Sequence, residues 1–168
     1  MDHDDPNPKP DRESLTRLAD RIRPLPLRPT EASDRVEGTR YFDWSNWSEA
    51  WSSESTHTCG TYGCVAGWAV ELFPDRLHIE RGCVRIIGES TFFDPLQAFG
   101  LTFREGRAIT CGDPLNGPEG PEGPETLAEI PFALDEGTPT QAADRILAVL
   151  ALAEDRHARL SKEIPHGS

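Results

Sequence analysis

The alternation of apolar and polar residues predicts two long amphipathic helices, one near each end of the chain. The first covers residues 12–23, with Asp11 as N-cap and Pro24 as its end. The second begins at a capping box, Thr138-Pro139-Thr140-Gln141, with proline at the first helical position. Each helix has one apolar face at helical spacing: Leu15, Leu18, Ala19 and Ile22 in the first, and Ala143, Ile146, Leu147, Leu150, Ala153, His157 and Leu160 in the second.

Shorter elements are predicted between these helices. Trp44, Trp47 and Trp51 share one face of a helix capped by Asp43, and residues 63–73 form another short helix. Two β-rich runs around Gly82 indicate a hairpin of residues 77–79 and 83–87. A further pair of short helices follows, with caps at Asp94, Gly100 and the capping box Thr102-Phe103-Arg104-Glu105. The predicted fold is therefore mainly α with one small β-hairpin, an α+β class, in a compact single-domain helical arrangement.

The distribution of proline, glycine and charge predicts the domain limits. Residues 1–10 are acidic and rich in proline, which is typical of a disordered tail. Three consecutive Gly-Pro-Glu triplets begin at Gly117, and they predict a mobile loop over residues 112–125. We therefore expect one globular domain over residues 11–163 and a C-terminal tail over 164–168.

Charge and hydropathy exclude several classes of partner. Seventeen basic and 29 acidic side chains give a net charge of −12, which repels nucleic acid and anionic lipid. No apolar run approaches the roughly 18 residues that cross a bilayer. The N-terminus also lacks the apolar segment of a secretory signal, so we expect a cytoplasmic protein whose four cysteines are reduced or bind metal.

The segment Cys59-Gly60-Thr61-Tyr62-Gly63-Cys64-Val65-Ala66-Gly67-Trp68 is the candidate functional motif, and three interpretations of it stay open. It can be a tight loop-to-helix junction in which Thr61 caps the helix and Cys64 is a small buried residue. It can be a nucleophile site, with Cys59 near a helix N-terminus and His157 as base. It can be a zinc site, the one cofactor considered, with ligands His57, Cys59, Cys64 and Cys83. A disulfide between Cys59 and Cys64 is the remaining alternative.

The tryptophans have two possible roles. Trp44, Trp47, Trp51 and Trp68 either fill the core between their helices or form a stacking platform that binds a sugar, base or cation. Their helical spacing favours the core.

The order of motifs resembles a set of small proteins from bacteria and their phages that carry Cys-Gly-Thr-x-x-Cys-x-Ala-Gly-Trp. The resemblance rests on Leu18-Ala19-Asp20-x-Ile22, Phe42-Asp43-x-x-x-Trp47, the cysteine motif and Phe99-Gly100-Leu101-Thr102, and it covers most of residues 14–160. Cys111 departs from that pattern. The resemblance implies a shared fold and a site of interest, with no established activity and no catalytic residues.

Three functions follow as expectations. The first is a non-catalytic accessory domain, phage- or mobile-element-related, that binds another protein. The second is a cysteine-dependent hydrolase or transferase with Cys59 as nucleophile. The third is a small structural zinc-binding protein.

Overall fold

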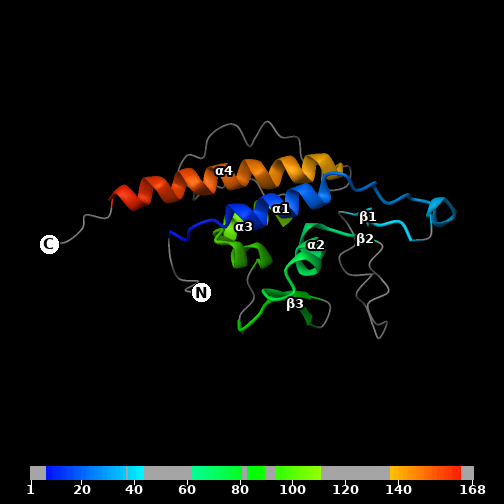
Figure 1. The fold of residues 1–168 in the computed structure, drawn as a ribbon, viewed down its shortest axis with the longest axis horizontal. Helices are drawn as coiled ribbons and strands as arrows, with labels where there is room; N and C mark the ends of the chain where they lie inside the picture. The colour runs from blue at the N-terminus through cyan, green and yellow to red at the C-terminus, as the bar shows by residue number, and fades with distance from the viewer. Residues whose placement is uncertain are drawn as a thin grey trace.

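A computed structural model describes residues 7–36, 38–43, 62–80, 83–89, 94–110 and 137–163 of the chain. Four α-helices dominate these residues, and two short β-pairings accompany them, so the predicted α+β class with a helical majority is confirmed. Figure 1 shows the longest helix, α4, lying along α1, with the smaller elements on the other side of α1.

The two long helices form the largest part of the core. α1 (Arg12–Ile22) begins at Asp11, whose carboxylate accepts from the Ser14 N–H at 3.1 Å. α4 (Pro139–Glu163) begins at the predicted capping box, in which Thr138 and Gln141 exchange hydrogen bonds of 2.7 and 3.2 Å. Burying one large aliphatic side chain contributes roughly 1.5–3 kcal/mol, and the facing surfaces bury Leu15, Leu18, Ala19 and Ile22 against Ala142, Ala143, Ile146, Val149, Leu150 and Ala153.

α4 packs on two neighbours, α1 and α3 (Phe103–Thr110), and its buried face is therefore wider than one helical stripe. Val149 is fully buried, whereas Leu147, which the spacing assigned to the core face, is half-buried. Arg145 is also buried, and its Nε donates to the Ala108 carbonyl near the C-terminal end of α3. The last carbonyl groups of a helix accept no hydrogen bond within it, so a cation at this end of α3 is stabilising.

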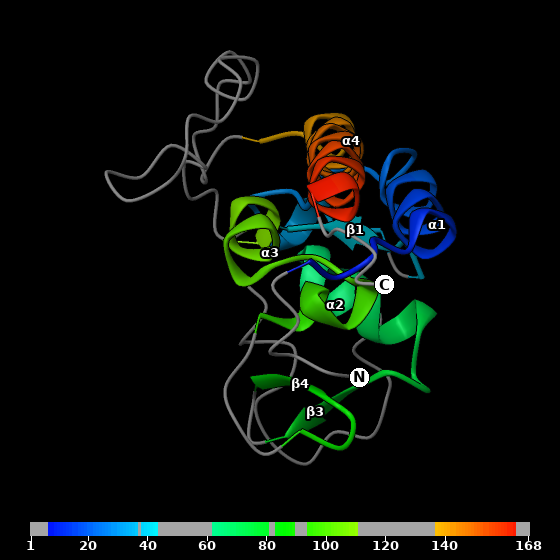
Figure 2. The same ribbon diagram turned by 90° about the vertical axis from the view of Figure 1, so that its left-hand side faces the viewer.

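The smaller elements lie below the long pair. α2 (Val65–Leu72) contacts α1, α3 and the 3-10 helix η2 (Pro95–Phe99), and in Figure 2 the hairpin lies farthest from α4. The hairpin pairs β3 (Leu77–Glu80) antiparallel to β4 (Cys83–Ile86), with Leu77 opposite Ile86 and Glu80 opposite Cys83. This pairing confirms the predicted hairpin.

The predicted caps of the central helices are also present. Asp94 accepts from the Leu96 N–H at 3.0 Å, and Gly100 ends η2 in the left-handed conformation with φ 73°. Thr102 and Glu105 form the capping box of α3, with bonds of 2.7 and 3.3 Å. These local signals therefore fix where η2 ends and α3 begins.

Residues 7–10, which composition assigned to the disordered tail, pack against the fold, and we call them the N-terminal strap. The Asn7 side chain hydrogen-bonds to α4, Pro10 is buried, and the Asp11 N–H donates to the Phe99 carbonyl at 2.8 Å. At Gly100 the strap passes so close that a Cβ would overlap the Lys9 carbonyl oxygen and lie 2.7 Å from its carbon. Through these contacts the strap joins α4 to the end of η2. Residues 1–6, 112–125 and 164–168 lie outside the described residues.

Between α1 and α2 the chain makes a projection, visible at the right of Figure 1, that we call the arm (residues 24–36 and 38–40). Its two ends are joined by a parallel bridge between Leu27 and Phe42, with backbone bonds of 2.8 and 2.9 Å. It contains a 3-10 turn, η1 (Ala32–Asp34), and leads into β1 (Tyr41–Phe42), which pairs parallel with β2 (Tyr62–Gly63). The sequence did not predict this parallel pairing.

Among the described residues, no helix combines the length and the low charge content that crossing a bilayer requires.

Candidate functional site

The second half of the cysteine motif forms the start of α2. Cys64 is the N-cap, and the predicted capping role of Thr61 is wrong because the helix begins three residues later than that role requires. Val65, Ala66, Gly67, Trp68 and Ala69 are all buried. The small residues among them, Ala66, Gly67 and Ala69, let neighbouring elements approach α2 closely.

The Cys64 thiol is buried in the hydrophobic core, and this burial raises its pKa above the ordinary value. The backbone N–H groups of Gly67 and Ala66 lower the pKa, the Asp43 carboxylate raises it, and the net effect is upward. A thiol with a raised pKa stays protonated at neutral pH and is a poor nucleophile. At Cys64, therefore, the helix N-terminus does not produce a thiolate.

The other predicted site residues are only partly placed. His57, Cys59, Trp44, Trp47 and Trp51 lie outside the described residues, and Cys83 begins β4 opposite Glu80. No three His, Cys, Asp or Glu side chains gather as metal ligands within the described part of the chain. The nucleophile and zinc interpretations stay predictions.

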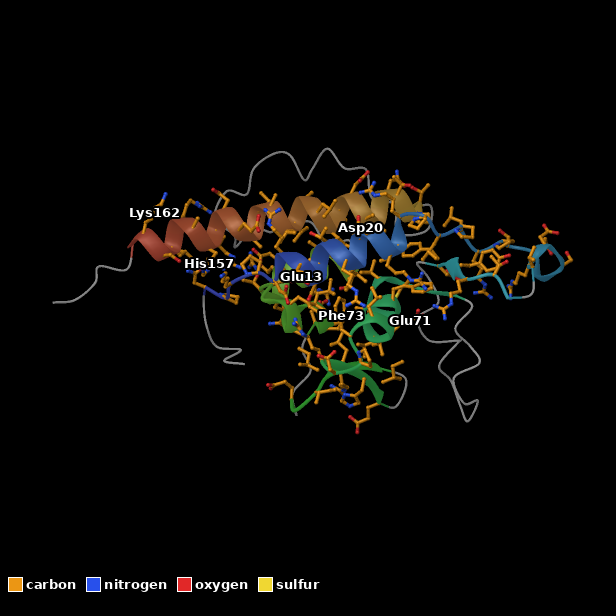
Figure 3. The ribbon with its side chains drawn as sticks, in the orientation of Figure 1. Glu13, Asp20, Glu71, Phe73, His157 and Lys162 are labelled. Carbon is orange, nitrogen blue, oxygen red and sulfur yellow. The ribbon has the colours of Figure 1, made fainter. Side chains whose placement is uncertain are left out.

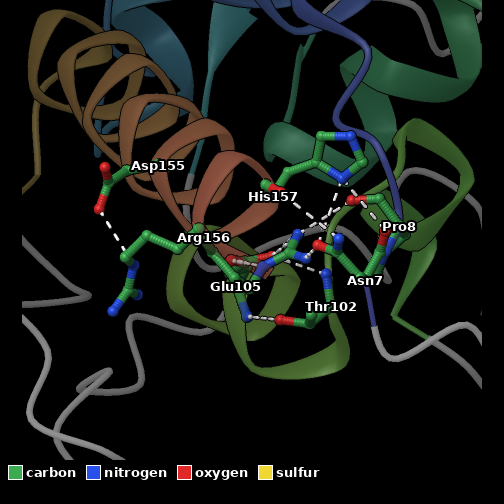
Figure 4. A network of polar contacts seen from close by, with 8 residues as sticks. Asn7, Pro8, Thr102, Glu105, Asp155, Arg156 and His157 are labelled. Carbon is green, nitrogen blue, oxygen red and sulfur yellow. Dashed lines mark hydrogen bonds and ion pairs between the residues drawn. The ribbon is translucent and has the colours of Figure 1, made fainter. Parts of the chain in front are cut away.

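His157 lies in the C-terminal half of α4, within a polar network around the strap (Figure 4). Its Nδ1 is 3.2 Å from both the carbonyl and the side-chain oxygen of Asn7. Two acceptors at Nδ1 require a proton on that nitrogen. Beside it, Arg156 donates from Nε to Glu105 at 2.8 Å, and both side chains of this pair are largely buried. His157 therefore takes part in holding the strap.

The edge of α2 is covered by arginines that lie over aromatic rings. Arg21 and Arg40 lie 5.1 and 5.9 Å from the centre of the Trp68 ring, at distances typical of cation–π contacts. Both also contact one carboxylate, Glu71, which Figure 3 labels on the outer side of α2.

The same arrangement continues along α1 toward η2. Arg17 lies 5.5 Å from the centre of the Phe73 ring, and Arg76 lies 5.4 Å from the Phe99 ring. The two phenylalanines are themselves in edge-to-face contact, with centroids 4.9 Å apart. Arg76 is paired with Asp11 at 2.7 Å. We call these four arginines on three rings the arginine shelf: Arg17, Arg21, Arg40 and Arg76 over Trp68, Phe73 and Phe99.

Two donor groups of the shelf, the Arg17 guanidinium and the Trp68 indole, have no hydrogen-bond acceptor among the residues that the structure describes. Within the described residues the Arg17 guanidinium makes no hydrogen bond or ion pair, only its contact with Phe73. The Nε1–H of Trp68 is buried and has no acceptor. An unsatisfied buried donor costs about 1–3 kcal/mol.

Comparison of the chain with protein-family models, curated proteins and solved structures finds no match. The resemblance to bacterial and phage proteins therefore stays a prediction, and function must be inferred from the site itself.

Only part of the shelf could be found from the sequence. Arg17 and Arg21 are four residues apart and therefore neighbours on α1, which the sequence does indicate. Their ring partners, Trp68 and Phe73, are about fifty residues away in the sequence. No local sequence pattern around the arginines or around the rings predicts that they are in contact. Trp68 was predicted either to fill the core or to form a binding platform. It is 3% exposed and is part of the hydrophobic core.

Proposed function

We propose that the chain is a non-catalytic protein-interaction domain that binds another protein through its arm. The observation that carries this proposal is the exposure of two large apolar side chains on the arm: Leu27 is 45% exposed and Val36 is 65% exposed. Covering apolar side chains that project into water lowers the free energy, so their exposure favours binding of a partner.

The arm is held in place by specific contacts, which supports the same proposal. The Val36 N–H donates to the Tyr41 hydroxyl at 2.9 Å. At the base of the arm, Arg28 pairs with Asp43 at 2.7 Å, and both side chains are largely buried. An arm fixed before binding loses less conformational entropy when it binds.

The motif helix adds support for a role without catalysis. Its one cysteine within the described residues, Cys64, is buried and has a raised pKa, and the described candidate base, His157, hydrogen-bonds to the strap. Both groups contribute to packing in the structure, and neither is prepared for proton or acyl transfer.

Photo-crosslinking in the native cell tests this proposal. A benzophenone amino acid placed at Val36 should give one discrete cross-linked species, because this position faces the partner. The same amino acid at Arg159, which is 70% exposed on α4, is the matched control and should give none. The proposal is wrong if Val36 gives no adduct, or if both positions give the same set of adducts.

A double substitution provides the second test. Leu27→Ser with Val36→Ser should abolish the complex while changing the free energy of unfolding by less than about 1 kcal/mol, because surface substitutions have small effects. A complex that survives both substitutions would contradict the proposal.

A further inference from the structure

We infer that the partner protein presents a basic surface to the arm, with lysine or arginine side chains around an apolar contact. This inference rests on the proposed function, because it names the chemistry of the protein that the arm binds. Glu31 and Asp34 are both exposed at the tip of the arm, where η1 forms the turn at the right of Figure 1. Val36, which is 65% exposed, follows Asp34 by two positions. The tip therefore combines carboxylates with an apolar side chain.

The arginines at the two ends of the arm are paired with carboxylates from other parts of the chain. Arg28 pairs with Asp43, and Arg40 pairs with Glu71. Between these two arginines, residues 29–39 contain three acidic side chains and one basic side chain, a formal charge of −2. The tip of the arm therefore has an excess of negative charge.

The two described carboxylates of the tip are available to a partner. Neither Glu31 nor Asp34 forms an ion pair with a residue that the structure describes. Asp34 accepts a hydrogen bond of 3.3 Å from the hydroxyl of Ser33, which is neutral. A carboxylate accepts charge-assisted hydrogen bonds from lysine or arginine, so basic side chains of a partner can pair with both groups without displacing another cation.

The apolar side chains of the arm distinguish a protein from a small cation as the occupant. Metal ions and polyamines can neutralise the carboxylates, but they do not cover the exposed Leu27 and Val36. Protein interfaces commonly have an apolar centre surrounded by a polar rim. A protein surface with an apolar residue against Val36 and basic residues around it matches both features of the tip.

The charge of the whole chain favours the same partner. A net charge of −12 attracts a basic protein at long range and repels an acidic protein, nucleic acid or a second copy of this chain. α1 offers no equivalent surface, because it contains three arginines and two acidic residues. Excess negative charge and exposed apolar side chains therefore coincide at the tip of the arm.

Charge reversal at the tip tests the inference in the native cell, with the benzophenone amino acid placed at Val36. Glu31→Lys combined with Asp34→Lys should lower the yield of the cross-linked species at least about tenfold, because two attractive contacts become repulsive. Glu31→Gln combined with Asp34→Asn should lower the yield about fivefold, because two exposed ion pairs are lost.

Glu13→Lys combined with Asp20→Lys is the matched control. Both residues, labelled in Figure 3, are exposed on α1 and, like the tip carboxylates, form no ion pair with a described residue. This variant has the same net charge as the reversed tip and should keep the yield within about twofold. Equal losses in the two reversed variants would overturn the inference, because the effect would then depend on net charge alone.

A defined probe provides an independent test on the full chain. The probe is a blocked hexapeptide of alternating lysine and leucine, and its counterpart has glutamate in place of lysine. We expect the lysine peptide to shift the amide NMR signals of Asp34 and Val36, less so at higher salt, and the glutamate peptide to leave both signals unchanged. A response of these signals to both peptides, or to neither, would contradict a basic partner.

The outcomes separate this inference from the proposed function. If the Val36 adduct forms in the parent chain and persists unchanged after charge reversal at the tip, the inference is wrong and the proposed function stands. An adduct that joins two copies of this chain would also overturn the inference. If Val36 gives no adduct in the parent chain, the proposed function is wrong and this inference fails with it.

Discussion

Replacing Gly100 by alanine tests how much the N-terminal strap contributes to stability. Gly100 ends η2 at φ 73°, a conformation that costs any other L-residue about 1–2 kcal/mol. A Cβ there would also overlap the Lys9 carbonyl oxygen and lie 3.1 Å from the Pro10 Cα. Both neighbours are backbone, so they cannot rotate away, and the strap must leave its place.

The expected magnitude has two parts. The backbone part is the 1–2 kcal/mol of the left-handed conformation. The second part is the loss of strap contacts, including the Asp11 N–H to Phe99 and the Arg156 bond to the Pro8 carbonyl at 3.2 Å. At a net 0.5–1.5 kcal/mol for each bond, these losses amount to roughly 2 kcal/mol. We therefore expect Gly100→Ala to lower the free energy of unfolding by about 3–4 kcal/mol.

Gly88→Ala is the control, because Gly88 has φ 87° and no atom lies within 4 Å of the position of its Cβ. It should cost only the backbone part, about 1–2 kcal/mol. Urea unfolding measures both variants, and hydrogen exchange at the Asp11 amide should become faster in Gly100→Ala alone. Equal destabilisation by the two substitutions, with unchanged exchange at Asp11, would refute the role given to the strap.

Three further predictions concern charged and reactive groups. Glu105→Gln should lower the free energy of unfolding by about 3 kcal/mol in urea denaturation, because it leaves the largely buried Arg156 without its carboxylate; a loss below 1 kcal/mol would contradict this. Cys64 should resist iodoacetamide in the native protein at pH 8 and react only on unfolding, as mass spectrometry of labelled peptides can show. Asp11 is partly buried, which raises its pKa, but hydrogen bonds from the Ser14 N–H and from Arg76 outweigh burial and lower it. Its stabilising contribution is therefore present above about pH 4 and lost as the pH falls through the lowered folded-state value; Asp11→Asn should weaken the acid-induced loss of stability, and an unchanged pH profile would refute this.

The parts of the fold that local sequence determines were predictable. The caps at Asp11, Asp94 and Thr138 depend on residues at most three positions apart, so they can be recognised without knowing the tertiary structure. The hairpin is similar, because two residues separate its paired ends, Glu80 and Cys83. These signals fixed most helix starts and the strand pairing of the hairpin.

The parts that depend on distant contacts were not predictable. β1 and β2 have two residues each, too few for an alternating pattern, and their pairing exists only because other elements bring Phe42 beside Gly63. The strap was missed for a related reason: its proline and charge content is typical of disorder, while its partners His157 and Arg156 are about 150 residues away. Composition predicts whether a segment is ordered in isolation, and it does not show that contacts with a distant part of the chain order it.

The candidate site likewise has one part that local sequence predicts and another part that depends on distant contacts. Burial of Cys64 agrees with the packing interpretation of the motif, since small residues at a helix start indicate close approach whatever the partner is. The shelf required the structure, because cation–π contacts join α1, the arm and the segment after α2. Its signal in the sequence is limited to arginines at helical spacing on α1.

The burial of α2 explains why arginines cover its edge. α2 has no basic residue in its last turn, and Glu71 is the only charged residue in it, so its aromatic edge must be covered by side chains from other elements. Arginine suits this role because its stem and guanidinium plane cover a ring while its N–H groups stay in water. Arg21 and Arg40 perform this role at Trp68 of α2 with Glu71 as counter-ion, and Arg76 covers Phe99 of η2 with Asp11 as counter-ion. Arg17 covers Phe73 in the same way, and among the described residues it forms no ion pair.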